Sequence, residues 1–440
     1  MRAVPLWTLA PFAGLLFSIA LLPLAAPRFW ESNRNKTIVS ATFGLPIVLW
    51  LVIAHGAAGW TELGHRATEF SSFIALLGAL YVISGGIYLR GSLAGTPLAN
   101  TALLGVGALL ANVIGTTGAS VVLIRPLLRA NQKRERKAHL VVFFIFIVSN
   151  CGGLLTPLGD PPLFLGFLKG VPFEWTLQLW PEWLLVNGAL LVIFNFWDQI
   201  VIDREEMEKA EALLEEVQHH EPLGISGRRN LAFLAGVVAT IYSSGSGLGN
   251  GGVPWPFGLA EGLMLALAAA SFVSTSRELH RLNVFTWHPI LEVAALFAGI
   301  FVAMTPALLY VNEHAASFGI ASPAHFFWAT GVLSSFLDNA PAYLTFAATA
   351  CGLDGIPLEG RYLATYLAHG GDNAEILAAI STSAVFMGAN TYLGNGPNFM
   401  VKAIAEHSGI RMPSFFGYMA YSGAILLPLF VLVTFVFFRA

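Results

Sequence analysis

The sequence predicts an all-α polytopic membrane protein of about ten transmembrane helices, in two inverted repeats that each contain a re-entrant hairpin and a broken helix. Three observations predict this fold class. The 440 residues are 56% hydrophobic and only 11% charged, with a mean hydropathy of +0.68. The 44 glycines and 23 prolines interrupt several apolar stretches, and one motif occurs twice, half a chain apart. The net charge of −3, without a basic tail, gives no indication of nucleic-acid binding.

Apolar runs of about 20 residues, the length that crosses a bilayer, predict the membrane spans. These spans are 7–26, 38–58, 70–89, 138–169, 180–201, 230–247, 258–275, 287–311, 375–406 and 414–438. Two further apolar stretches, 98–129 and 323–350, have Gly, Pro, Asn or Asp near their middles, so we expect each to be a re-entrant hairpin. Spans 138–169 and 375–406 are interrupted in the same way and are expected to be broken helices.

Lysine and arginine residues set the expected orientation, because they concentrate in cytoplasmic loops. With both termini outside, most of the 23 Lys and Arg residues lie on the cytoplasmic side. This holds only if both hairpins return to the side from which they enter. The chain then divides into a first repeat (1–202), an acidic cytoplasmic linker (203–229) and a second repeat (230–440). We expect a multi-pass protein of the cell's inner (plasma) membrane, with the lipid bilayer as a partner.

An internal repeat accounts for a carboxylate in the middle of an apolar run. The motif TPLGDPP at 156–162 recurs as TYLGNGP at 391–397, so that Asp160 matches Asn395. Each half has five crossings, an odd number, and the second half is therefore inverted relative to the first. Inverted repeats are typical of secondary transporters, in which helix breaks meet near the bilayer midplane and bind ions.

Two aspartates are the main candidates for the chemistry of such a site. We expect Asp160 to lie in the first break, where Gly159 eases the turn and Pro161 starts the next half-helix. An alternative is that Asp160 only caps that half-helix, although capping and ion binding are compatible. Asp338 lies in the hairpin sequence SFLDNAPAYL, and an ionisable group in a membrane segment is a functional candidate.

Oxygen-bearing side chains at the breaks and hairpin centres complete the predicted ion or substrate site, since such oxygens suit a hard cation such as Na⁺. The predicted binding residues are Asp160, Asp338, Asn339, Asn112, Thr116, Thr117, Asn150, Thr156, Asn390, Thr391 and Asn395. For the Asn and Thr residues, turn formation and tight helix packing are alternative roles. Glu292 is a third intramembrane acid, either a proton relay or an interfacial residue. We expect no cofactor and no structural metal, with Na⁺ and H⁺ as coupling or transported ions.

The stretch SNCGGLLTPLGDPP, the LDNAP hairpin and the repeated broken helices resemble the ion transporter superfamily over nearly the whole chain. That superfamily includes NhaD-type sodium/proton antiporters, citrate transporters, arsenite permeases and sodium-coupled dicarboxylate carriers. The glycines before Asp160 and the Asp338–Asn339 pair look most like the NhaD-type antiporters, which implies that both aspartates are functional. The resemblance also implies a homodimer. Neither hairpin has the Ser-Asn-Thr tip of the dicarboxylate carriers, and the first hairpin lacks a carboxylate.

The leading functional hypothesis is sodium (or other cation)/proton antiport by alternating access. Each half supplies one buried aspartate, and no Lys or Arg lies near the proposed site. Burial disfavours the charged form of a carboxylate, so Na⁺ and H⁺ would compete for the same oxygens.

The alternative is uptake of citrate or another carboxylate, coupled to H⁺ or Na⁺. The hydroxyl-rich GTTGAS hairpin favours it, but Asp338 would repel a polyanion unless it is protonated or loaded with a cation. A third possibility is an intramembrane aspartyl protease, but the sequence before Asp160 lacks the first glycine of the protease motif. The sequence therefore predicts a transporter for a small ion or organic anion, and not an enzyme.

Overall fold

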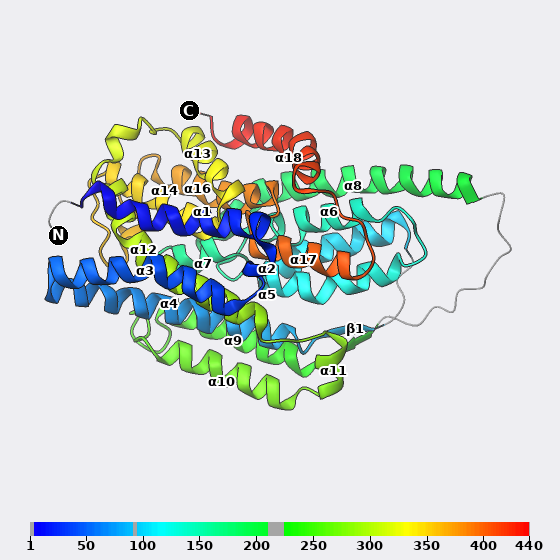
Figure 1. Ribbon diagram of the computed structural model, residues 1–440, viewed down its shortest axis with the longest axis horizontal. Helices are drawn as coiled ribbons and strands as arrows, with labels where there is room; N and C mark the ends of the chain where they lie inside the picture. The colour runs from blue at the N-terminus through cyan, green and yellow to red at the C-terminus, as the bar shows by residue number, and fades with distance from the viewer. Residues whose placement is uncertain (1–3, 91–94, 210–223, 440) are drawn as a thin grey trace.

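The computed structural model describes residues 4–90, 95–209 and 224–439, and nearly all of its regular structure is helical (Figure 1). The first half contains η1 (Leu6–Thr8), α1 (Leu9–Ala25), α2 (Pro27–Trp30), α3 (Asn33–His55), α4 (Ala57–Ser84), β1 (Tyr88–Arg90), α5 (Pro97–Ala130), α6 (Ala138–Ile147), η2 (Cys151–Leu154), α7 (Pro161–Leu168), η3 (Phe173–Leu179) and α8 (Trp180–Lys209). The second half contains β2 (Gly224–Ser226), α9 (Arg229–Ser246), α10 (Leu259–Ser274), α11 (Arg277–Leu282), α12 (His288–Glu313), η4 (Ala315–Phe318), α13 (Pro323–Phe336), α14 (Asn339–Leu353), α15 (Tyr362–Ala368), α16 (Asn373–Met387), η5 (Gly388–Asn390), α17 (Gly396–His407) and α18 (Phe415–Phe437).

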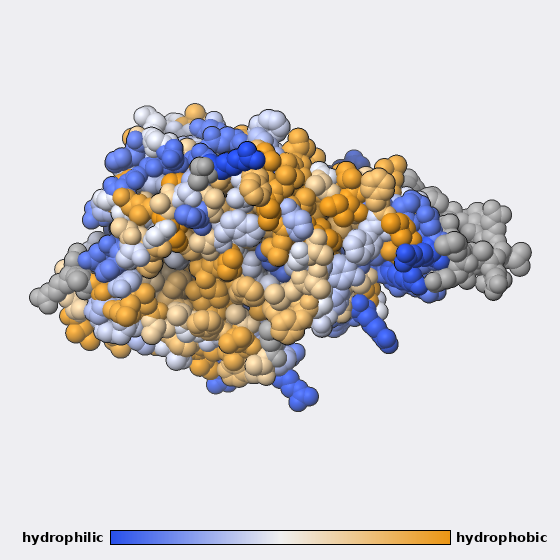
Figure 2. All heavy atoms as spheres, turned by 90° about the horizontal axis from the view of Figure 1, so that it is seen from above, coloured by the Kyte–Doolittle hydropathy of each residue, from blue (hydrophilic) through white to orange (hydrophobic). Residues whose placement is uncertain are grey.

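Each predicted span coincides with a helix or with a pair of helix pieces. Within the described ranges, 7 helices are long and apolar enough to cross a membrane. The outer helices carry exposed apolar side chains such as Ile53 and Phe416, which are 81% and 79% exposed. Figure 2 shows a broad apolar surface across the middle of one face, with hydrophilic residues mostly toward the ends. This distribution is that of a polytopic membrane protein.

Helix α5 folds back on itself at Gly115, whose backbone angles of φ 76° and ψ 155° are not helical. A straight helix of its 34 residues would be about 51 Å long. Instead, the Nδ2 of Asn100, near its start, lies 3.0 Å from the Oδ1 of Asn131, just after its end. Residues 97–130 are therefore a helical hairpin, with bounds within one residue of the predicted 98–129.

Helices α13 and α14 form a second helical hairpin, with its turn at Leu337 and Asp338. The rings of Phe326 and Phe346, one on each arm, are 6.5 Å apart. Pro323 at the first position of α13 follows a Ser322 hydroxyl that caps the helix, which explains why the hairpin begins there.

The two broken segments, α6–η2–α7 and α16–η5–α17, run antiparallel. Lys169, at the end of α7, accepts through its carbonyl a 3.0 Å bond from the N–H of Leu363, shortly before α16 begins. At the opposite end, Ala138 at the start of α6 shares a cavity with Gly409, which follows α17. The breaks therefore meet in the middle of the molecule.

A short antiparallel sheet, which the sequence analysis did not predict, pairs β1 with β2, with Tyr88 opposite Ser226. Within the predicted acidic linker, 203–229, helix α8 continues to Lys209. The rest of that prediction, 210–223, falls outside the described residues. In Figure 1 both termini lie toward one end of the molecule, and the end of α8 lies at the other.

Candidate functional site

Asp160 lies at the centre of the molecule and is only 1% exposed. Its Oδ1 accepts hydrogen bonds from the Thr116 hydroxyl at 2.8 Å and from the Asn395 amide at 3.1 Å. Its Oδ2 accepts a hydrogen bond from the Asn339 amide. We call Asp160, Thr116, Asn339 and Asn395 the central cluster. Its members come from both hairpins and both breaks.

The cluster pairs equivalent positions of the two halves. Thr156 and Thr391, which match in the repeated motif, donate their hydroxyls to the carbonyls of Asn112 and Ser335, at 2.5 Å and 2.6 Å. Asn112 and Ser335 are thus equivalent positions of the two hairpins. At equal distances after them in the sequence, Gly115 corresponds to Asp338 and Thr116 corresponds to Asn339. The two equivalent hairpin residues therefore both donate to Asp160. Asn395, its own repeat mate, does the same.

Asp160 has no cationic partner among the residues that the structure describes. All of its donors are neutral hydroxyl or amide groups. The nearest lysine along the chain, Lys169, pairs instead with Glu69. A buried carboxylate without a positive partner is costly in its charged form, so a proton or a small cation would be stabilised there.

The two predicted acids have different local roles. Asp160 occupies the position before α7 with extended angles of φ −147° and ψ 147°, but its side chain makes no capping bond. The carboxylate of Asp338 does cap α14, accepting from the N–H of Ala340 at 3.1 Å. Asp338 is half-buried, whereas the adjacent Asn339 is fully buried. Asp338 is thus the more accessible acid.

A chain of amides extends the central cluster into the second break. Asn395 also donates to the Oδ1 of Asn150 at 3.2 Å, and Asn150 donates to the Oδ1 of Asn398 at 2.6 Å. Asn398 then donates to the carbonyls of Gly388 and Thr391, both at 2.9 Å. The sequence analysis missed Asn398, because the matching position of the first half is the apolar Leu163.

Several of the predicted binding residues form hydrogen bonds that connect the breaks to the hairpins. Asn112 uses its whole amide on backbone groups, donating to Ala108 and Gly152 and accepting from Leu155. Asn390 donates to the Ser335 hydroxyl at 2.9 Å. Together with Thr156 and Thr391, these residues have a structural role that fixes where the central cluster lies.

Glu292 lies away from the central cluster, in the first turns of α12. Its Oε1 forms a 2.7 Å ion pair with the Nζ of Lys36 on α3. Glu292 is 33% exposed, while Lys36 is only 4% exposed. The geometry fits an interfacial ion pair and gives no link between Glu292 and Asp160.

A cavity of about 60 Å³ lies beside the cluster, lined by Thr116, Thr117 and Gly159 on one side and by Ile290 and Val293 of α12 on the other. This volume holds a few water molecules. Thr117 turns toward this space without joining the cluster. Among the described residues, no group of three or more His, Cys, Asp or Glu side chains is placed to hold a metal ion.

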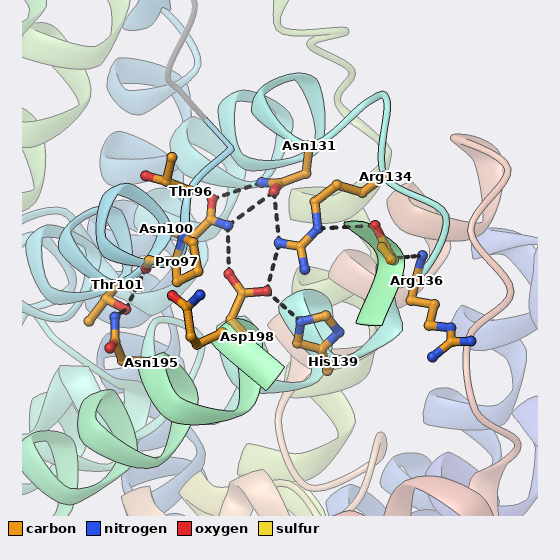
Figure 3. Close-up of polar contacts among 12 residues, drawn as sticks. Thr96, Pro97, Asn100, Thr101, Asn131, Arg134, Arg136, His139, Asn195 and Asp198 are labelled. Carbon is orange, nitrogen blue, oxygen red and sulfur yellow. Dashed lines mark hydrogen bonds and ion pairs between the residues drawn. The ribbon is translucent and has the colours of Figure 1, made fainter. Parts of the chain in front are cut away.

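A second buried polar network, which the sequence analysis did not anticipate, lies at the base of the first hairpin (Figure 3). Asp198 of α8 is 0% exposed and pairs with Arg134 at 2.6 Å and His139 at 2.8 Å. It also accepts from Asn100 at 2.9 Å, and Asn100 bonds to Asn131. The network joins both ends of the hairpin to α6 and α8. Asp198 lies in the predicted span 180–201 and so carried the same signal as Asp160, whereas its partner Arg134 lies in a basic loop and gave none.

Helix breaks that meet at a buried, oxygen-rich cluster inside a polytopic protein are typical of membrane transporters. The comparisons with known proteins agree. The family model described as "Putative citrate transport" matches residues 1–438, and the chain belongs to that family. No curated protein matches the chain significantly. The prediction of a transporter, and not an enzyme, is confirmed by the family.

Proposed function

We propose that this protein carries citrate or a related carboxylate across the membrane, coupled to H⁺ or Na⁺. The substrate class is supported by the family, whose description is citrate transport over residues 1–438. The single observation that carries the coupling is the position of Asp160. It is a carboxylate buried between both halves of the chain and held by neutral donors alone.

Electrostatics gives the coupling its physical basis. A citrate anion approaching a negative Asp338 or Asp160 is repelled, and the described part of the cluster has no arginine to offset that repulsion. A proton or Na⁺ bound first removes the repulsion, so the anion binds only to the loaded site. Coupling then follows from charge alone.

Oxygen atoms for a cation are available beside the two acids. The Oδ1 of Asn339 is buried and has no hydrogen-bond partner among the described residues. Asp338, the residue before Asn339, uses only one of its carboxylate oxygens to cap α14. Amide and carboxylate oxygens of this kind are ligands for hard cations. These two residues are the proposed entry point of the coupling ion.

Alternating access between two inverted repeats is the proposed cycle. It is supported by the antiparallel broken segments and by the matched contacts of Thr156 and Thr391. The two helical hairpins would then be re-entrant, each opening to its own side of the membrane. The small cavity beside Thr117 fits an occluded state, in which the substrate space is closed.

Cation/proton antiport is a second candidate function, and it is favoured by the same cluster. Asp160 without a cationic partner could alternate between H⁺ and Na⁺. The family description weighs against antiport as the main activity.

Proteoliposomes that contain the purified protein separate the two functions. Under our proposal, labelled citrate accumulates when an inward H⁺ or Na⁺ gradient is imposed, and not without one. An antiporter would instead dissipate a preformed pH gradient on addition of Na⁺ or Li⁺, with no citrate present. Gradient dissipation without any citrate binding or uptake would refute the proposed function.

A further inference from the structure

A cavity of about 470 Å³ lies apart from the central cluster, where the start of α6, α8 and the loop after α17 meet. Its lining includes the cationic residues Arg136, Lys137 and Arg411, with Glu135 as the acid. The N-terminus of α6 opens into it through Ala138, and no side chain caps that helix. Both the cationic side chains and the helix N-terminus attract an anion.

The predicted topology places the cavity at the cytoplasmic boundary of the membrane. Its basic residues belong to two loops that are predicted to face the cytoplasm. Trp197 and Tyr421 form its wall, with ring centroids 5.8 Å apart. Paired aromatic rings next to cationic loops are typical of the boundary between membrane and water.

An exposed apolar stripe runs along α8, next to the helix face that lines this cavity. Val192, Phe196 and Ile200 are spaced four residues apart and are 56%, 67% and 52% exposed. Residues at this spacing share one helix face, and the cavity-lining Trp197 and Val201 lie on the adjacent face of the same helix. A soluble anion gains nothing from such a stripe, whereas an acyl chain would lie along it.

We propose that this cavity binds the phosphate headgroup of an anionic phospholipid, with an acyl chain against the α8 stripe. Lys137 and Arg411 supply charge from two segments that are far apart in the sequence. Basic pockets between membrane helices are suited to such headgroups. This proposal does not depend on which ion or anion is transported.

The cavity also borders the network at the base of the first hairpin. His139 lines the cavity and bonds to Asp198, which accepts from Asn100 at the start of the hairpin (Figure 3). Lipid binding would therefore stabilise the base of the hairpin as well as the cavity itself.

Thermal unfolding of the delipidated full-length protein in detergent tests the proposal. Phosphatidylglycerol should raise the Tm in a saturable way, and phosphatidylcholine should not. The variant Lys137→Gln/Arg411→Gln should raise the half-saturating phosphatidylglycerol concentration by roughly tenfold or more, because it removes two cations near the surface. Arg277→Gln, which removes an exposed cation far from the cavity, is the matched control and should respond like the wild type.

Three results would overturn the proposal. They are equal stabilisation by both lipids, an unchanged response of the double variant, and full stabilisation by inorganic phosphate alone, which would indicate a soluble anion. If the double variant does not fold, a photoactivatable phosphatidylglycerol analogue on the wild-type protein decides. Its crosslinks should concentrate in peptides that contain residues 135–139, 192–201 or 409–421, and crosslinks elsewhere only would refute the site.

Discussion

Asp160 and Asn395 occupy equivalent positions with nearly identical backbones, at φ −147° and ψ 147° for Asp160 and φ −152° and ψ 141° for Asn395. One is a carboxylate that accepts three hydrogen bonds, and the other is an amide that donates one of them. The repeat thus places an acid and its amide counterpart face to face. This difference between the halves makes the cluster asymmetric, with its charge on one side.

Replacement of Asp160 by Asn should leave the protein folded. The new amide can still accept from Thr116 and Asn395, and it can donate to Asn339 if that amide rotates to present its unpartnered Oδ1. We expect Asp160→Asn to lower stability by less than about 1 kcal/mol. Asp160→Ala leaves buried donors without an acceptor and should cost at least about 1–3 kcal/mol. Thermal-shift measurement of both variants checks this, and equal Tm values would contradict the hydrogen-bond assignment.

Two substitutions of Asp338 should distinguish its role as a helix cap from its role as a charged group. Asn is a good helix cap, so Asp338→Asn should keep the bond to Ala340 and the stability while it removes the carboxylate. Asp338→Ala should lose the cap, at a cost of about 0.5–2 kcal/mol. We expect gradient-driven citrate accumulation to be lost in both variants, because the charge that the coupling ion neutralises is gone. Uptake at wild-type rate by Asp338→Asn would mean that Asp338 is only a cap.

At the residue scale, the sequence predicted the acids better than their surroundings. Asp160 and Asp338 stood out because ionisable groups are rare in apolar runs, and Asn395 followed from the repeat. Asn112 and Asn339 are both amides near a hairpin centre, so the sequence does not distinguish them. In the folded chain, Asn112 bonds to backbone groups while Asn339 bonds to Asp160. Asn398 had no repeat mate to indicate it.

At the scale of elements, the hairpin turns differ in the residue that makes them. The first turn uses Gly115 at φ 76°, and the second uses Asp338 at φ −53°. The first hairpin therefore has glycine at the position where the second has its carboxylate. Asp338 is therefore the only acid at the two hairpin turns, and it lies next to a cluster whose own acid, Asp160, comes from a break.

Gly115→Ala tests the first turn. A side chain at this φ is strained, and its Cβ would lie 3.2 Å from the carbonyl oxygen of Leu158. We expect a loss of about 1–3 kcal/mol of stability together with loss of transport. Gly105→Ala in the same hairpin is the control, because its Cβ meets only Leu191 at 3.6 Å. It should be neutral or slightly stabilising, and a similar loss in both variants would contradict the special role of Gly115.

Element bounds were predictable because glycine, proline and polar residues interrupt apolar runs. The hairpin predicted at 323–350 is observed as α13 and α14, which end at Leu353. The pairing of β1 with β2 was not predictable, because strands of 3 residues are too short to show a pattern. The buried network at Asp198 was also missed, since it depends on loops that meet only in the folded chain.

At the scale of the whole molecule, the proposed inverted repeat predicts that the two hairpins enter the membrane from opposite sides. Cysteine at the exposed position Gln132 should react with an impermeant thiol reagent from the cytoplasm, and cysteine at Glu359 should react from outside. The native Cys151 and Cys351 are buried and should give little background. Labelling of both positions from one side would refute the inverted arrangement.

The antiparallel course of the broken segments followed from one repeated heptapeptide and an odd number of crossings. The contacts between Lys169 and Leu363, and around Asp160 and Asn395, agree with that course. What the sequence left open was the substrate. Hydroxyls, amides and carboxylates can bind a cation, or an organic anion once a proton or cation is bound, equally well. The family evidence now favours citrate.

Gradient-driven citrate uptake by Asp160→Asn, measured beside the wild type in the same proteoliposomes, tests the coupling most directly. Wild-type protein should accumulate labelled citrate under an inward H⁺ or Na⁺ gradient. The variant, folded and reconstituted to the same level, should show no gradient-driven accumulation, because the buried charge that the coupling ion neutralises is gone. Accumulation by the variant to the wild-type level, with the same dependence on the gradient, would contradict the assignment of coupling to Asp160.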